Sequence, residues 1–176
     1  MEVEGAIILY TLAGLMVTFA GFSALLLGIR QAAGAKLSLL DRFLAKTVLT
    51  DLFILTAMAL LPAVLALYGL PRDMVWRISA VFFALTMLIF LLSYPRRRRK
   101  AVGHGPPPIV FAIFIVLGSA VIVAMLLAIL AGFRYSAAAY ITALLANFFT
   151  LAFAFVSAMD VIMQQPTEAT SRDQEG

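Results

Sequence analysis

The chain has 176 residues, of which 64% are hydrophobic and 12% are charged, and its mean hydropathy is +1.05. A soluble domain is about 45–50% apolar and about 25% charged, so this composition excludes a water-soluble fold. The net charge of +4 does not indicate nucleic-acid binding, because the cations cluster at the ends of apolar runs, where they anchor helices in a membrane. The absence of cysteine excludes disulfides and thiolate metal sites.

Five apolar runs are long enough, or nearly so, to cross a bilayer as helices, since one span needs about 20 residues. Lipid offers the backbone no hydrogen-bond partner and the pattern lacks β-barrel alternation, so every span is expected to be helical. The sequence therefore predicts an all-α integral membrane protein, a five-transmembrane-helix bundle forming one polytopic domain over residues 1–163. The predicted spans cover residues 6–29, 43–70, 75–94, 109–133 and 137–163, and the polar segment 164–176 is expected to be a disordered cytoplasmic tail.

Turn-forming residues delimit these runs. Ser38 followed by Asp41 is typical of a helix N-cap with an acid in the first turn. Gly69 and Pro71 predict the end of the second helix. Pro95 predicts the end of the third, because proline has no backbone N–H with which to continue a helix.

The uneven distribution of basic residues predicts the orientation of the chain. Ten of the 13 lysines and arginines flank the first and third loops or lie in the tail, and three lie on the other side. The positive-inside rule places the ten in the cytoplasm, with the N-terminus outside and the C-terminus inside. Aromatic residues expected at the outer interface agree: Tyr10, Tyr68, Trp76, Tyr135 and Tyr140. With a residue usage typical of bacteria, this indicates a multi-pass protein of the bacterial inner membrane.

Small residues recur along the first span and predict helix packing. They are Gly14, Thr18, Ala20, Gly21, Ala24 and Gly28. Small side chains let helix backbones approach closely, which drives association where the solvent is as apolar as leucine. We favour packing inside the bundle, and contact with a second copy of the chain is the alternative.

The last span has a small and polar face and an opposite apolar face. The small and polar face consists of Ala139, Ala143, Ala146, Asn147, Thr150, Ala154 and Ser157. The apolar face consists of Leu144, Phe148, Leu151 and Phe155. Because polar groups turn away from lipid, we expect the polar face to point inward, the apolar face to contact acyl chains, and this helix to be the best-buried one.

Asp51 lies within the second span, nine residues after Arg42, or about 13 Å along a helix. An intramembrane carboxylate costs about 2.5–3.5 kcal/mol to insert, which makes it a functional-site hypothesis by default. It has three interpretations: a structural hydrogen bond to Thr47 or to serines of neighbouring helices (Ser23 or Ser157), an ion pair with Lys46 or a partner's cation, or a titrating group in a proton or cation path. The candidate intramembrane polar site comprises Asp51, Thr47, Asn147, Thr150 and Ser157.

The residues that membrane catalysis requires are not found in a suitable arrangement. His104 is the single histidine and lies in a loop, which excludes a serine–histidine dyad inside the membrane and bis-histidine haem ligation within one chain. Asp160 lacks the glycine-rich surroundings of the second aspartate in intramembrane aspartyl proteases. There is neither a P-loop nor a dinucleotide fingerprint. We therefore expect no catalytic residue, no metal and no cofactor.

Five consecutive cations precede the fourth span: Arg96, Arg97, Arg98, Arg99 and Lys100. Such a cluster attracts anionic lipid head groups with about 1 kcal/mol per cation, and the alternative is that it only sets topology.

These features predict a small membrane protein without catalysis, acting as an interaction or accessory subunit with a membrane-protein partner or another copy of itself. The alternative is a homo-oligomeric channel or a proton-coupled small-solute transporter in which Asp51, Asn147 and Thr150 line the path. Five spans do not divide into two inverted halves, so a transporter of the inverted-repeat kind would need a homodimer.

Overall fold

A computed structural model describes the chain except for residues 1–4, 33–37, 104, 106–107, 131–135 and 164–176. The described residues contain no strand. They form the helices α1 (Ala6–Ala32), α2 (Leu39–Leu67), α3 (Arg72–Val102), α4 (Pro108–Leu130) and α5 (Ser136–Met163). Four of these, α1, α2, α3 and α5, are long and apolar enough in their described parts to cross a membrane. The helices thus agree with the expected multi-pass helical bundle, and the predicted tail lies outside the described residues.

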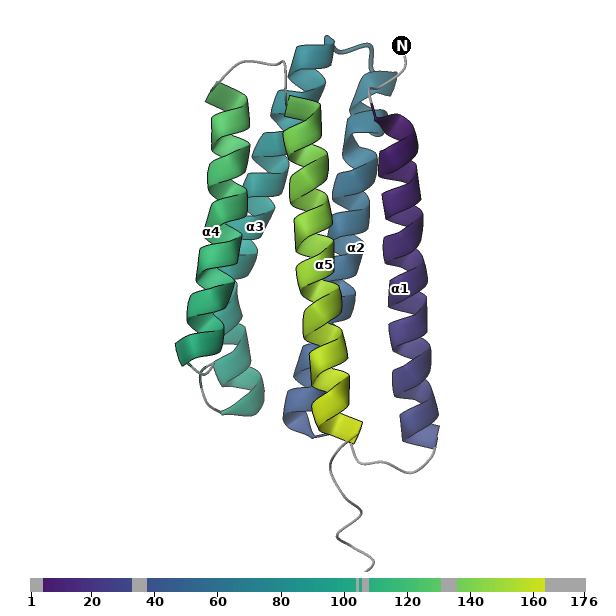
Figure 1. Cartoon of the computed structure of the whole chain (residues 1–176), viewed down its shortest axis with the longest axis vertical. Helices are drawn as coiled ribbons and strands as arrows, with labels where there is room; N and C mark the ends of the chain where they lie inside the picture. Colours follow the sequence, from purple (N-terminus) through teal and green to yellow (C-terminus); the bar gives the residue numbers. More distant parts are fainter. Residues whose placement is uncertain (1–4, 33–37, 104, 106–107, 131–135, 164–176) are drawn as a thin grey trace, which may run out of the picture.

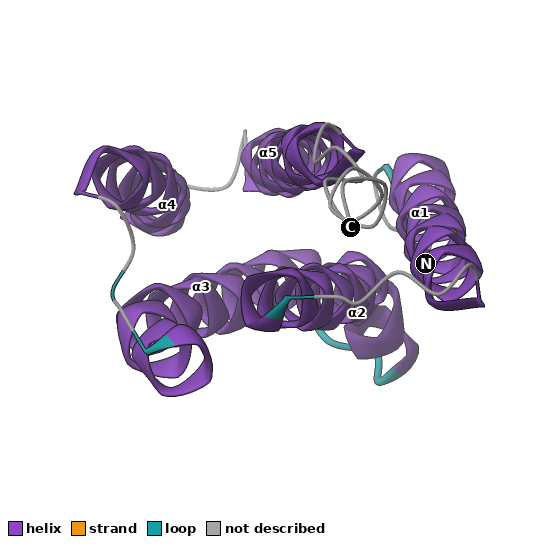
Figure 2. Cartoon of the chain, turned by 90° about the horizontal axis from the view of Figure 1, so that it is seen from below, coloured by secondary structure: helices purple, strands orange, loops and turns teal. Residues whose placement is uncertain are grey.

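The helices run roughly antiparallel to their neighbours in sequence and form a flattened bundle (Figure 1). Viewed along the helix axes, α2 and α3 lie side by side in one row, and α4, α5 and α1 form the facing row (Figure 2). Helix α1 packs mainly against α2, while α4 packs against α3 and α5. Helices α1 and α4 therefore occupy opposite edges, with α5 between them.

The predicted caps of α2 are confirmed. The Ser38 hydroxyl accepts a hydrogen bond from the Asp41 backbone N–H at 3.1 Å, and the Asp41 carboxylate accepts one from the Ser38 N–H at 3.0 Å. This reciprocal capping box satisfies two N–H groups that a helix start leaves without partners. At the other end Gly69 takes a φ of 71°, a left-handed conformation that glycine adopts at little cost.

The predicted end of the third helix at Pro95 is wrong. Helix α3 continues through Pro95 to Val102 and ends at Gly103, whose φ is 85° and whose N–H bonds to the Arg99 carbonyl at 3.0 Å. A proline in a helix removes one backbone hydrogen bond, but the arginines and lysine that follow are good helix formers. The five cations consequently lie on a helix rather than in a loop.

Pro62 has a different consequence inside α2. Because proline has no N–H, the carbonyl of Met58, four residues earlier, loses its helical donor. The Tyr140 hydroxyl of α5 donates to this carbonyl at 2.7 Å. A backbone carbonyl without a partner is costly in a membrane, so this bond both satisfies α2 and fixes α5 against it.

Tyr140 and Trp76, which were predicted to lie near the outer face of the membrane, are packed between helices and do not face lipid. Both are buried, with ring centroids 5.7 Å apart, and the Tyr140 ring also contacts Phe83 at 5.6 Å. Tyr10 and Tyr68 are exposed, as an interfacial belt requires, and Tyr135 lies outside the described residues. Amphipathic rings suit either an interface or a core in which they find packing partners, and sequence alone does not distinguish the two.

Candidate functional site

A cavity of about 450 Å³ lies between α2, α3, α4 and α5. Much of its wall consists of small residues of α4 and α5: Gly118, Ala120, Ala124, Ala138, Ala139, Ala143 and Ala146. The larger apolar residues of the wall are Met87, Phe90, Leu91, Leu117 and Val121. Its polar side chains are Asp51, Thr142, Asn147 and Thr150. The space exists because faces of small side chains on α4 and α5 border it, so little side-chain volume fills the gap.

The hydrogen bond between Tyr140 and Met58 sets the register of α5 against the antiparallel α2. Asp51 precedes Met58 by seven residues and Asn147 follows Tyr140 by seven, so both lie about 10 Å from that bond in the same direction. The carboxylate of α2 and the amide of α5 therefore share one level of the cavity. Thr150 lies about one turn further along α5.

Asp51 is only 3% exposed, and its Oδ1 accepts no hydrogen bond. The nearby hydroxyls do not supply one, because Ser23 Oγ and Thr47 Oγ1 are also buried without partners. The predicted structural bond from Asp51 to Thr47 or Ser23 is thus not formed. The Arg97 guanidinium is close enough to act electrostatically on the carboxylate, and it also lies 5.5 Å from the centroid of the Phe90 ring.

Asn147 is oriented by a sulfur atom. Its Nδ2 donates to Sδ of Met87 at 2.8 Å, which joins α5 to α3 beside the cavity. A thioether is a weak acceptor, so the amide gives up little to exchange this partner for a stronger one. The Thr150 hydroxyl donates to the Ala146 carbonyl at 2.8 Å, and its oxygen lone pairs can still accept a hydrogen bond.

The structure brings three of the five predicted polar residues, Asp51, Asn147 and Thr150, to one cavity. Thr47 is buried one turn from Asp51 and does not line the cavity, and the side chain of Ser157 lies outside the described residues. Sequence reasoning did not identify Arg97 as the cation near Asp51, since the third helix was expected to end before it. It also missed the wall on α4, although Gly118 and Ala124 interrupt a run of bulky residues there.

The expected lipid-facing side of α5 is wrong. Leu144 and Phe155 are buried, and the Phe19 ring of α1 contacts Phe148 at 5.8 Å and Phe155 at 5.5 Å, both edge to face. The exposed side of α5 carries Phe149, Phe153 and Val156 instead. Helix α5 is also not the best-buried helix. In its most apolar stretch of 18 residues 22% of the residues are buried, whereas 39% are buried in the corresponding stretch of α3. Lipid is as apolar as a protein core, so hydrophobicity does not tell an inward phenylalanine face from an outward one.

Ala20 is the one of the six predicted small residues of α1 that is buried in the bundle, and the small stripe formed by the other five does not pack inside it. Gly14, Thr18, Gly21, Ala24 and Gly28 are all exposed, and a Cβ added at any of the three glycines would meet no side chain of the described residues. The face of α1 that packs inward consists of Leu9, Leu12, Ala13, Met16, Ala20 and Ser23. Packing inside the bundle, the interpretation favoured above, is therefore wrong for this stripe, and contact with another chain is the alternative that stands.

The five cations of α3 have unequal surroundings. Arg96, Arg99 and Lys100 are exposed, Arg97 is half-buried and Arg98 is buried. Arg96, Arg97 and Lys100 border a surface groove of about 300 Å³ together with Ile89, Leu92 and Ser93. The groove therefore has apolar residues along one part and cations along the other.

The described residues hold no group of three or more carboxylates or histidines placed to bind a metal ion. Comparison of the chain with protein-family models, curated proteins and solved structures finds no match, so the Asp51 cavity is interpreted from its own residues alone.

Proposed function

We propose that the protein carries a small solute across the membrane and uses the Asp51 cavity as its binding site. The observation that supports this most is that Asp51, Asn147 and Thr150 line one cavity large enough for a small molecule. A carboxylate, an amide and two hydroxyls in an otherwise apolar intramembrane cavity are typical of a solute or proton pathway. The cavity lies within one chain, which favours a carrier over a pore between copies.

Asp51 has the central role in this proposal. It is the ionisable residue of the cavity wall, and its Oδ1 has no hydrogen-bond partner. A carboxylate in this position can exchange a proton for a bound solute, which couples the two movements. A second copy of the chain, held through the outer face of α1, would supply the symmetry that five spans lack.

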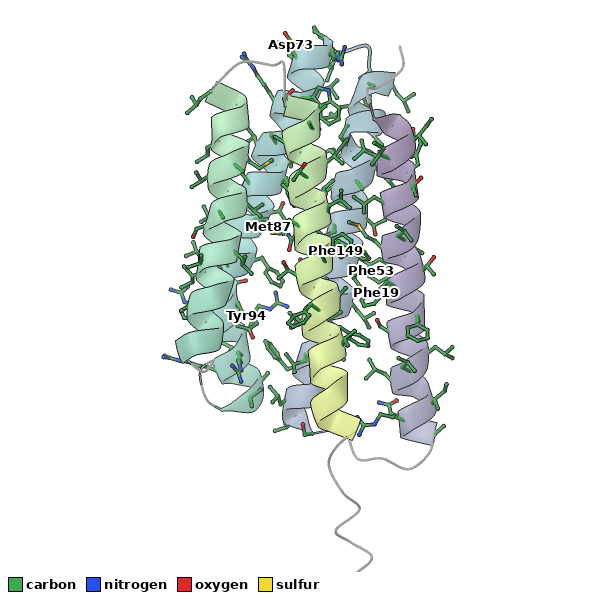
Figure 3. All side chains as sticks on the ribbon, viewed as in Figure 1. Phe19, Phe53, Asp73, Met87, Tyr94 and Phe149 are labelled. Carbon is green, nitrogen blue, oxygen red and sulfur yellow. The ribbon has the colours of Figure 1, made fainter. Side chains whose placement is uncertain are left out.

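Flux through proteoliposomes tests the proposal. Full-length protein is reconstituted with internal dyes sensitive to pH, to sodium or to potassium, and movement of each ion is measured against empty liposomes. We expect flux that Asp51→Asn abolishes and Asp73→Asn retains, because Asp73 lies at the far end of the bundle (Figure 3). Absence of flux for any of these ions, or equal flux in both variants, would count against a carrier.

The proposed topology has five spans in a bacterial inner membrane, with the N-terminus outside and the C-terminus in the cytoplasm. The uneven distribution of cations supports it, together with the exposed Tyr10 and Tyr68. A reporter that is active only in the cytoplasm is expected to be active when it is fused after residue 164, and a reporter that is active only outside the cytoplasm is expected to be inactive there. An extracytoplasmic signal would overturn the orientation.

A second candidate function is a non-catalytic accessory subunit, and the exposed small-residue stripe of α1 supports it. The three glycines are spaced seven residues apart, so they recur on one face of the helix, where a partner helix could approach closely. The mass of the complex extracted in mild detergent distinguishes the two functions. A larger co-purifying protein favours the accessory subunit, whereas a homo-oligomer without partner favours the carrier.

Anionic lipid is the proposed occupant of the groove beside Arg96 and Lys100. These cations are four residues apart on one face of α3, below the apolar Ile89 and Leu92. The double variant Arg96→Gln, Lys100→Gln is expected to lose co-purifying anionic lipid, measured by mass spectrometry. Arg99→Gln, an exposed cation outside the groove, is the control, and equal retention in both would remove this proposal.

A further inference from the structure

The cavity is polar at one end and apolar along the rest of its length. On α5 its wall runs from Ala138 to Thr150, twelve residues or about 18 Å. Asn147 and Thr150 lie toward one end, and Asp51 faces them at the level of Asn147. Toward Ala138 the wall consists of alanines, and Thr142 is the single polar side chain that the described part of the wall carries there. A ligand that fits therefore has one polar end and an apolar body.

The charge at the polar end favours a cation. Asp51 is 3% exposed, and its Oδ1 has no hydrogen-bond partner. In its ionised form, the form that binds a solute in exchange for a proton, the carboxylate accepts hydrogen bonds and donates none, so its missing partner is a donor. An ammonium group provides up to three N–H donors and a positive charge, and charge-assisted bonds of this kind are about twice as strong as neutral ones.

Arg97 limits the charge of that ligand. Its guanidinium acts on the Asp51 carboxylate electrostatically without bonding Oδ1, and it lies 5.5 Å from the centroid of the Phe90 ring. Asp51 is the one carboxylate that the described part of the wall carries, so the cavity offers a counter-charge to one ammonium group at most. A second ammonium group would lie against the apolar wall without a counter-ion and would be repelled by Arg97, so we exclude diamines and polyamines.

The apolar wall excludes hydrophilic solutes. A sugar, nucleotide or peptide would bury many donors and acceptors against alanine, and each group left without a partner costs about 1–3 kcal/mol. A volume of about 450 Å³ is about three times that of a cavity that holds the six carbon atoms of benzene, so it has room for a compact hydrocarbon body of about ten or more carbon atoms.

We infer that the cavity binds an amphipathic monoamine, with its ammonium group against Asp51 and Asn147 and its hydrocarbon body against the alanines of α5 and the small residues of α4. The inference rests on the proposed function for the location of the site, and it adds the class of ligand. Binding needs neither flux nor a second copy, so the two proposals fail separately.

Equilibrium dialysis of the full-length protein in nanodiscs tests the inference, with empty nanodiscs as the correction for partition into lipid. The probes are 1-adamantylammonium and its neutral isostere 1-adamantanol. We expect Asp51→Asn to weaken binding of the ammonium at least tenfold and to leave binding of the alcohol unchanged. Asp73→Asn, which removes a carboxylate at the far end of the bundle, should bind both probes like the original chain.

A second variant covers the case in which Asp51→Asn does not fold. Ala146→Phe fills the cavity from the exposed side of α5 and retains the carboxylate, so both probes should lose binding. Equal binding of the ammonium and the alcohol to the original chain, or unchanged ammonium binding in both variants, overturns the inference. Ammonium binding without flux contradicts the carrier alone, and flux without ammonium binding contradicts the ligand class alone.

Discussion

The outer face of α1 and the wall of the cavity are built from the same kinds of residue and have opposite surroundings. Gly14, Gly21 and Gly28 have no side chain of the described residues near their Cβ positions, whereas a Cβ at Gly118 would lie 3.4 Å from Leu91 Cδ1. Both faces match the pattern expected of close helix packing. The comparison shows that a face of small residues permits close contact but does not determine whether another helix, a ligand or lipid occupies it.

The difference arises from what lies opposite each face. The side of α5 that lines the cavity faces Asp51 and Met87 in the bundle interior. Asn147 of α5 donates a hydrogen bond to the sulfur atom of Met87. The inward face of α1 carries large residues such as Leu12 and Met16, which bury apolar area against α2 and α5. The glycines of α1 are left to the outside because the large residues occupy the inside.

Phe19→Ala is expected to have the largest effect, since the Phe19 ring of α1 contacts two phenylalanine rings of α5. Phenylalanine-to-alanine changes in cores cost about 3–5 kcal/mol, and Phe19 is half-buried, so we expect a loss of about 2–4 kcal/mol. Unfolding in mixed detergent micelles measures it. Phe22→Ala, on the exposed side of the same helix, should change stability by less than about 0.5 kcal/mol. Equal losses in both variants would contradict the assignment of the two faces.

Tyr140→Phe tests the register that brings Asn147 level with Asp51. Removing the hydroxyl leaves the Met58 carbonyl without a donor beneath Pro62, so we expect a loss of about 1–3 kcal/mol in the same unfolding assay. Tyr10→Phe is the control, because Tyr10 is exposed. A Tyr140→Phe variant as stable as the original chain would show that packing alone sets the register.

Asp51→Leu is expected to stabilise the folded protein while abolishing flux. It removes a buried carboxylate oxygen without a partner, and the cavity has room for the larger side chain, so the gain is about 1–2 kcal/mol. The midpoint of thermal unfolding in detergent checks the direction. A loss of stability would mean that Asp51 has a structural partner in the membrane and would favour the accessory subunit.

Gly21→Leu is expected to have the smallest effect on the single chain, less than about 0.5 kcal/mol, because its position is open. Its effect should appear in the mass of the detergent-extracted complex if the α1 face holds another chain. A large loss of stability without a change in mass would show that the glycine face packs inside the bundle after all.

Several features of the fold follow directly from local sequence. The capping box at Ser38 and the turn at Gly69 were predicted correctly, because each depends on residues within a few positions of one another. The prediction that the third helix ends at Pro95 was wrong. A proline removes one backbone hydrogen bond from a helix, and the residues that follow it decide whether the helix continues.

The candidate site was predictable in part. Asp51, Asn147 and Thr150 were selected because polar residues are rare in apolar spans and turn away from lipid. Their common cavity, the proximity of Arg97 and the wall on α4 depend on which helices become neighbours, and no local pattern specifies that. The same limit explains why the stripe of α1 and the phenylalanine face of α5 were assigned to the wrong surroundings.

The sequence by itself determined that the chain is helical and apolar enough for a membrane, and it determined which polar residues the membrane must accommodate. Only the tertiary structure decided which helix faces look inward. The physical reason is that lipid and protein interior are nearly equally apolar, so burying a leucine or phenylalanine face against either gains a similar free energy. Three features decide which face turns inward. They are the fit between the helix surfaces, the hydrogen bond from Tyr140 to the Met58 carbonyl, which Pro62 leaves without a helical donor, and the position of the Asp51 carboxylate.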